Sequence, residues 1–307
     1  MKAESLGPSV LLAVAVAALS PVSHAAARPP AESGPSTITV TVVGKKEAPP
    51  LIAKSDVQLS QGKERKQVAK WVKAEKLYLA IVIDDSLDSE VASQWNDVRQ
   101  FILAQPQTTS IAIGYASNAT VRVAQDFTTN HELAAKALRI PIGRSAESSP
   151  YLSVIDWMKR WPATGDPRSL LLISSGIDYF RAGFGPIYPD VDTAISIAEK
   201  GNINLWTIYA PGSGHRSRSF FLANNAQNNL SKLSEETGGE AFYLGTSAPV
   251  SFKPYLDELQ MHLNNQYLLT FAGDGGPKGK LVSVRLKTEV AQAEFMHANQ
   301  AWLPPAK

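Results

Sequence analysis

The feature that most constrains this fold is the uninterrupted apolar run LYLAIVID at residues 77–84, which leads directly into acidic residues. A strand with one face in solvent alternates apolar and polar residues, whereas an unbroken run is typical of a strand covered on both faces. The run SLLLISSG at 169–176 has the same character and ends in small polar residues. Together the two runs predict a parallel sheet within an α/β domain at residues 76–266.

Strand and helix patterns alternate around these two runs. An apolar stripe with the spacing of one helix face follows the first run and consists of Val91, Trp95, Val98 and Ile102. Further strands are expected at 109–117, 119–127, 202–210 and 240–245, and further helices at 133–138, 151–161, 190–200, 221–237 and 254–266. We therefore expect a doubly wound, mostly parallel six-stranded sheet with helices on both faces, in which 119–127 is the antiparallel strand.

The segments on either side of the α/β domain have the composition of β structure. Residues 37–75 contain short runs rich in β-branched residues and predict a small β add-on. The runs 267–273 and 280–286 flank the Gly-rich sequence DGGPKG, which favours a β-hairpin within a C-terminal extension of residues 267–307. Two small β additions to one main domain are therefore expected.

The N-terminus has the composition of an export signal. An apolar segment at 9–20 follows Lys2 and precedes small residues suited to cleavage, so residues 1–27 predict a signal peptide, with an uncleaved N-terminal anchor as the alternative. Residues 28–36 are rich in Pro, Ser and Ala and predict a flexible linker. We find no other segment long and apolar enough to cross a bilayer. The mature chain is therefore expected to be secreted or periplasmic, without a transmembrane helix.

Composition and missing motifs narrow the function classes. The 30 Lys and Arg residues nearly balance the 28 Asp and Glu residues and are dispersed along the chain, which disfavours a nucleic-acid partner. The sequence contains no cysteine, which excludes thiolate nucleophiles and cysteine metal sites. It also lacks a Gly-x-Ser-x-Gly elbow and a His-Glu-x-x-His zinc helix. We therefore assign no catalytic residue.

Two loops contain charged candidates for partner binding. In PGSGHRSRSFF (211–221), the glycine spacing is incomplete for a dinucleotide site, and we expect no organic cofactor there. His215, Arg216 and Arg218 instead form a basic loop that could meet an acidic partner, with a plain solvated loop as the alternative. Asp178 follows the second apolar run and is a further candidate, for which the alternative is an ordinary solvent-exposed acid.

Five strings in fixed order give the chain a resemblance to a known family. They are LAIVIDDS, SSPYLSVIDWM, LLLISSGID, LSEETGGEAFYL and LNNQYLLTF, and together they span roughly residues 38–300. In this set the chain resembles von Willebrand factor type A domains, in particular the bacterial exported VWFA-related proteins. The resemblance implies a site at the carboxyl ends of the sheet, where such domains often hold a divalent cation, Mg²⁺ or Ca²⁺.

The family pattern for that cation is Asp-x-Ser-x-Ser, with a threonine on a second loop and an aspartate on a third. Asp84 and Ser86 match this pattern, Asp88 stands at the second serine, Ser149 at the threonine and Ser175 at the aspartate. The resemblance therefore implies a degenerate metal site of Asp84, Ser86, Asp88 and Ser149. The alternative is a metal-free polar turn in which Asp88 or Ser86 caps the following helix.

The functional expectation rests on this resemblance. It implies a non-enzymatic, exported binding or scaffolding protein whose protein partner docks on the crevice above Asp84, Ser149 and Ser175, with a bound ion or without one. The alternative from another class is a secreted metal-dependent hydrolase that uses Asp84 and Asp88. A hydrolase of this kind needs several convergent ligands, and the sequence presents only these two acids clearly.

Overall fold

The computed structural model describes residues 34–44, 48–147, 149–162, 164–180, 188–214, 219–242, 245 and 247–305. The predicted signal peptide and most of the predicted linker lie outside these ranges. Within the described part of the chain, no helix is long and apolar enough to cross a membrane. The elements below all belong to one compact unit, Glu32–Lys307.

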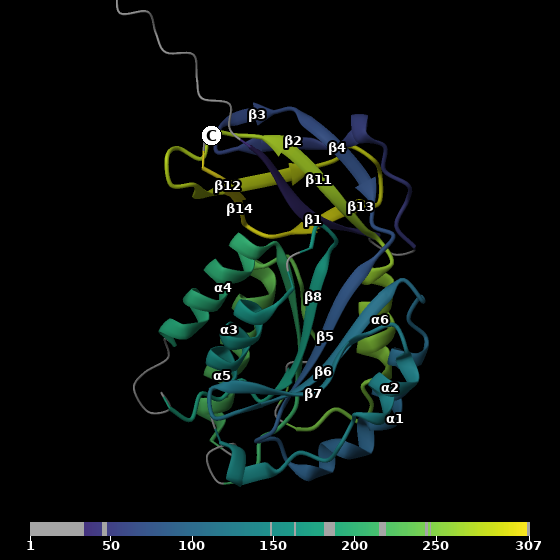
Figure 1. Cartoon of the computed structure of the whole chain (residues 1–307), viewed down its shortest axis with the longest axis vertical. Helices are drawn as coiled ribbons and strands as arrows, with labels where there is room; N and C mark the ends of the chain where they lie inside the picture. The colour runs from purple at the N-terminus through teal and green to yellow at the C-terminus, as the bar shows by residue number, and fades with distance from the viewer. Residues whose placement is uncertain are drawn as a thin grey trace, which may run out of the picture. The chain divides into compact units, whose positions relative to one another are not determined.

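A six-stranded sheet forms the centre of the α/β part, in the order β10, β9, β8, β5, β6, β7 (Figure 1). Its strands are β5 (Leu77–Asp84), β6 (Thr109–Ser117), β7 (Thr120–Thr128), β8 (Arg168–Ser174), β9 (Ile203–Tyr209) and β10 (Ala241–Phe242). Neighbouring strands are parallel except β7, which is antiparallel to β6. The predicted doubly wound, mostly parallel sheet is confirmed, including its antiparallel edge strand.

Helices cover both faces of this sheet (Figure 1). One face carries α1 (Trp95–Leu103), α2 (His131–Lys136) and α6 (Lys253–Leu263), and the other carries α3 (Pro150–Arg160), α4 (Pro189–Gly201) and α5 (Phe220–Glu236). Short 3-10 turns are η1 (Lys54–Asp56), η2 (Ser89–Gln94), which leads into α1, and η3 (Gly143–Ala146). Every helix expected from the sequence is present, with ends shifted by a few residues.

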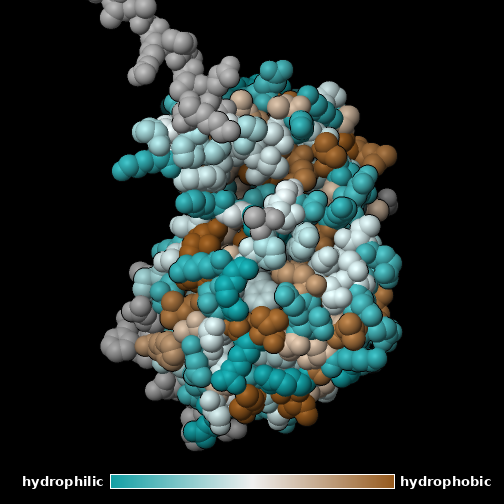
Figure 2. All heavy atoms as spheres, in the orientation of Figure 1, coloured by the Kyte–Doolittle hydropathy of each residue, from teal (hydrophilic) through white to brown (hydrophobic). Residues whose placement is uncertain are grey.

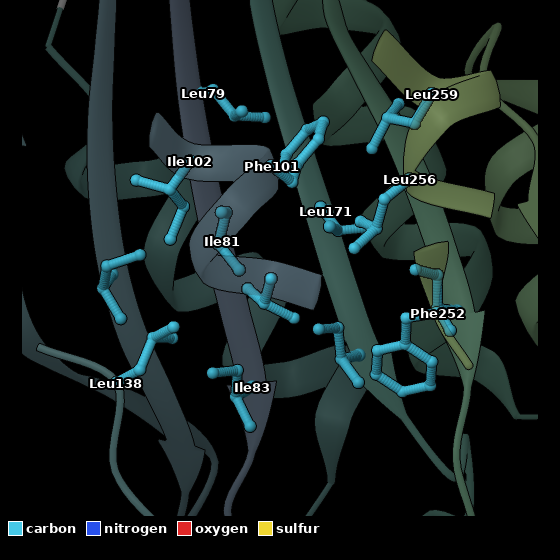
Figure 3. Packing of buried hydrophobic residues seen from close by; sticks show 14 of the residues in the cluster. Leu79, Ile81, Ile83, Phe101, Ile102, Leu138, Leu171, Phe252, Leu256 and Leu259 are labelled. Carbon is cyan, nitrogen blue, oxygen red and sulfur yellow. The ribbon is translucent and has the colours of Figure 1, made fainter. Parts of the chain in front are cut away.

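Side-chain alternation along β5 explains why its sequence is apolar throughout. Leu79, Ile81 and Ile83 pack toward α1 and α6, as Figure 3 shows, while Ala80 and Val82 belong to the core on the opposite face. A strand between two helical layers has no solvent-facing side, so every position favours an apolar residue. The two cores hold the carboxyl end of β5, and therefore Asp84, in a fixed position.

The remaining strands form two four-stranded sheets that share one core. One sheet has the order β13, β1, β11, β4 and the other β14, β12, β2, β3. Their bounds are β1 (Pro35–Gly44), β2 (Gln58–Gln61), β3 (Glu64–Lys66), β4 (Val68–Lys73), β11 (Gln266–Ala272), β12 (Lys280–Lys287), β13 (Ala293–His297) and β14 (Gln300–Leu303). Segments from both ends of the chain thus make one β-sandwich.

The expected pairing of 267–273 with 280–286 as a hairpin is wrong. β11 pairs with β1 and β4, whereas β12 pairs with β14 and β2. Leu269 and Phe271 of β11 share a buried core with Val284 and Leu286 of β12, so the two strands face each other from different sheets. A Gly-rich connection permits either a β-hairpin or two strands in different sheets. The second arrangement buries the apolar faces of both β11 and β12, and it is the one observed.

The sandwich contacts the amino ends of the six-stranded sheet. Asn202, just before β9, accepts a hydrogen bond from the Thr39 amide through its side-chain oxygen at 2.7 Å. Gln266 donates its side-chain amide to the hydroxyl of Ser169, at the start of β8, at 3.3 Å. Parallel strands have their carboxyl ends at the opposite edge, so Asp84 lies at the end of the sheet away from these contacts.

Candidate functional site

Asp84 is the last residue of β5 and is enclosed by hydroxyl groups. Asp84 is buried, with 3% of its surface exposed. One carboxylate oxygen accepts hydrogen bonds from the Ser86 hydroxyl at 2.7 Å and the Ser86 amide at 3.0 Å, and the other accepts from the Ser174 hydroxyl at 2.6 Å. Burial nevertheless raises the pKa of Asp84 above its ordinary value.

The neighbouring acid, Asp85, is buried against a cation. Both of its carboxylate oxygens accept hydrogen bonds from the Arg139 guanidinium at 2.7 Å, and one also accepts the Ile142 amide at 3.0 Å. The guanidinium stacks over the ring of Tyr115, 3.7 Å from its centre. Sequence reasoning gave Asp85 no separate role, because its partner is 54 residues away and no local spacing reveals the pair.

Ser149 and Asp178 meet on the second and third loops. The Ser149 hydroxyl caps α3 by accepting the Leu152 amide at 3.2 Å and donates to the Asp178 carboxylate at 2.8 Å. Asp178 is fully buried, so the alternative of a solvent-exposed loop acid is wrong. The chain turns at Gly176, which has a φ of 67°, and brings Asp178 back toward Ser149.

Asp88 caps η2, the short 3-10 turn that leads into α1. Its carboxylate accepts the Glu90 amide at 3.0 Å, and its residue is only half-buried. Ser175, which stands at the third-loop aspartate position of the family pattern, accepts the Ile177 amide at 3.3 Å. The helix-cap interpretation of Asp88 thus agrees with its hydrogen bond.

The loop after β9 closes over the site. Ser213 donates both its amide, at 3.0 Å, and its hydroxyl, at 2.9 Å, to the carbonyl of Ser86. A Cβ atom at Gly212 would lie 3.0 Å from the Tyr179 hydroxyl and 3.3 Å from the Ser175 hydroxyl, so the backbone passes directly above Ser175. The predicted basic residues of this loop, His215, Arg216 and Arg218, lie outside the described residues.

The family pattern implies a divalent cation at this site. The question is whether the oxygen atoms of the residues present can ligate one. Mg²⁺ needs about six oxygen ligands that converge on one point. Here the Ser86 and Ser174 hydroxyls donate to Asp84, and the Ser149 hydroxyl lies between Asp178 and the Leu152 amide. Asp88 caps η2, and the carboxylates of Asp84 and Asp178 each accept a hydroxyl donor, so we derive no chemistry through an ion.

Comparison with known proteins finds similarity in solved structures. No protein-family model and no curated protein matches the chain. A von Willebrand factor type A protein from Catenulispora acidiphila is 10% identical, covers 89% of this chain and 74% of its own, and has a TM-score of 0.45. An aerotolerance-related membrane protein from Bacteroides fragilis with multiple mutations to serines is 11% identical, covers 61% and 98%, and has a TM-score of 0.44.

A third similar structure is the von Willebrand factor domain of a type V pili tip protein from Porphyromonas gingivalis. It is 12% identical, covers 63% of this chain and 96% of its own, and has a TM-score of 0.42. Two of these three structures are described as von Willebrand factor type A or von Willebrand factor domains. At these identities the similarity concerns the fold, and the site is argued from the residues of this chain alone.

Proposed function

We propose that this chain is an exported, non-enzymatic binding or scaffolding protein whose protein partner docks on the carboxyl-end face without a divalent ion. The observation that carries the proposal is the hydrogen-bonded polar centre at Asp84, together with exposed apolar side chains on the segments near the carboxyl ends of the strands. Asp84 already accepts three hydrogen bonds from Ser86 and Ser174, and the loop at Gly212 passes above the site. A partner would therefore contact the rim of this centre.

Large apolar side chains are exposed on that rim. Six that are each more than half exposed are Ile140, Ile142, Phe180, Phe220, Phe221 and Val250. Phe180 follows β8, Phe220 and Phe221 begin α5 after β9, and Val250 follows β10. Ile140 and Ile142 lie in the segment after α2, in which the Ile142 amide donates to Asp85. On the face in Figure 2, hydrophobic residues form separate groups among hydrophilic ones. Exposed apolar clusters rimmed by polar residues are typical of interaction surfaces.

The ion pair between Asp85 and Arg139 holds part of this rim in place. Arg139 precedes Ile140, and its guanidinium is anchored on both oxygens of Asp85. The amides of Ile142 and Gly143 donate to the side chain and the carbonyl of Asp85, at 3.0 and 2.8 Å. A loop that is ordered before binding loses less entropy when its partner arrives. The pair therefore supports a preformed docking surface.

Site-specific photo-crosslinking tests this proposal in cells that produce the full chain. A crosslinker placed at Ile142 or Phe221 is expected to trap one discrete partner in the absence and in the presence of a chelator. The control position is Leu51, which is equally apolar and 85% exposed but lies in the β-sandwich part of the chain. Equal products from Leu51 would contradict a carboxyl-end surface, and loss of the product with chelator would contradict metal independence.

A further inference from the structure

A second group of ionisable side chains lies at the amino-end side of the sheet. Glu240 directly precedes β10, while Glu258 and His262 stand one turn apart on the same side of α6. The carboxylate oxygens and the imidazole nitrogen of these residues all lie within 4.8 Å of one another. The group is separate from the site at Asp84, which follows the carboxyl end of β5.

His262 gives this group an unused ligand. The residue is 2% exposed, and its Nδ1 atom has no hydrogen-bond partner among the described residues. The same atom lies 3.6 Å from a carboxylate oxygen of Glu240, which is too far for a good hydrogen bond. Trp206 and Phe242 pack against the ring at 5.5 and 6.3 Å between centres and hold it in this orientation. A buried polar atom that is left unpaired indicates a missing partner.

Burial and neighbouring charges change the ionisation of this group. Burial lowers the pKa of His262 to about 4, so the imidazole is neutral near pH 7 and its lone pair is free. Burial, together with the charges of Glu258 and Glu235, raises the pKa of Glu240 to about 7. Two carboxylates that repel each other beside an unpaired nitrogen would all be satisfied by one bound cation.

We propose that Glu240, Glu258 and His262 form a binding site for a divalent transition-metal ion of the Zn²⁺ type. An imidazole nitrogen favours Zn²⁺ and its neighbours in the transition series over Mg²⁺ and Ca²⁺, which prefer oxygen ligands alone. Three protein ligands leave a fourth position of a tetrahedral ion for water or for a group from a partner. The site is independent of the proposed docking surface.

A bound ion would join two elements that are distant in sequence. Glu240 is fixed by its carbonyl, which accepts the Thr207 amide at 3.0 Å. The helix α6 leads directly into β11, the strand between β1 and β4 in the sandwich. The ion would therefore fasten the edge of the six-stranded sheet to the helix from which the chain enters the sandwich.

Calorimetric titration of Zn²⁺ into the chelator-treated full chain tests this site. We expect saturable binding of one Zn²⁺ per chain, with no comparable heat for Mg²⁺. Removal of a residue that only supports a metal ligand lowers metal affinity by roughly 10- to 100-fold. Glu258 is an exposed, direct ligand in this proposal, so the Glu258→Gln variant is expected to lose more Zn²⁺ affinity than that. His262→Ala should abolish binding, but its buried position makes Glu258→Gln the safer variant for a folded protein.

The matched control is Glu235→Gln. Glu235 is exposed and acts on Glu240 through its charge, yet it is not one of the ligand atoms. This control is expected to retain affinity within about tenfold of the wild type. Equal losses of Zn²⁺ affinity in the Glu235→Gln and Glu258→Gln variants would mean that only the local negative charge matters. That result would overturn the proposed site. Absence of saturable Zn²⁺ binding to the wild-type chain would overturn it as well.

Discussion

At the scale of single residues, Asp84 and Asp85 are adjacent acids with different partners. Asp85 pairs with a guanidinium, whereas the donors to Asp84 among the described residues are two hydroxyls and an amide. Burial therefore costs free energy at Asp84, whose pKa is raised, because a desolvated charge without a cation is unfavourable. An aspartate thus stabilises the fold at position 85 and destabilises it at position 84.

This contrast predicts opposite effects of the same substitution. Asp85→Asn leaves Arg139 without its counter-charge, and we expect the free energy of unfolding to fall by about 2 kcal/mol, less than for a fully buried pair because the Arg139 side chain is 40% exposed. Asp84→Asn removes an uncompensated charge, and the expected change is within about 1 kcal/mol of zero or stabilising. Urea denaturation at pH 7 measures both variants. A larger loss for Asp84→Asn than for Asp85→Asn would contradict this account.

Prediction from sequence succeeded where a pattern is local. The runs at 77–84 and 169–176 predicted buried strands, because an unbroken apolar run is typical of a strand covered on both faces. The partner of Asp85 and the burial of Asp178 could not be predicted, because both depend on how loops distant in sequence meet. The group of Glu240 and His262 was missed for the same reason, since a lone histidine on an apolar helix face has no distinctive spacing.

At the scale of elements, the loop after β8 depends on one glycine. Gly176 has a φ of 67°, and a Cβ atom there would lie 2.8 Å from the Leu230 side chain and 2.9 Å from the Ala226 carbonyl. Its own carbonyl accepts the Tyr151 hydroxyl at 2.8 Å. The turn therefore packs α3, α5 and the loop together and sets the position of Asp178.

Gly176→Ala is expected to lower the free energy of unfolding by about 2–4 kcal/mol, because a left-handed φ and a steric clash add together. Gly62→Ala provides a control with a similar φ of 59° and open space around the Cβ, so only the backbone term of about 1 kcal/mol should remain. Thermal and urea denaturation compare the variants. Equal losses at both positions would show that packing against Leu230 contributes nothing.

At the scale of the whole molecule, Glu199 of α4 lies at the contact between the α/β part and the sandwich. Its residue is 3% exposed, and one carboxylate oxygen accepts the side-chain amide of Gln300, in β14, at 3.0 Å. Burial, with the nearby charge of Glu236, raises its pKa to about 7. Folding thus favours the protonated form of this group.

The raised pKa predicts how stability depends on pH. A folded pKa above the ordinary value of 4.5 contributes stability that is fully present below pH 4.5 and is lost as the pH rises through about 7. Relative to wild type, Glu199→Gln should therefore gain on the order of 2–3 kcal/mol of unfolding free energy between pH 5 and pH 8. Urea denaturation at both pH values gives this difference. The control Glu75→Gln, at an exposed position, should show a difference independent of pH.

The pairing of β1 with β11 also determines the order in which the chain can fold during synthesis. Pro35 is opposite Ala272 in this pair, so β1 leaves the ribosome long before its partner strand exists. In the interval, β1 presents unpaired backbone groups and the apolar side chains of Ile38, Val40 and Val42. The α/β part can fold before the last strands are synthesised, because its own strands pair with one another. The sandwich can form only after the last strands are synthesised, so it is the region of the nascent chain most prone to strand mispairing.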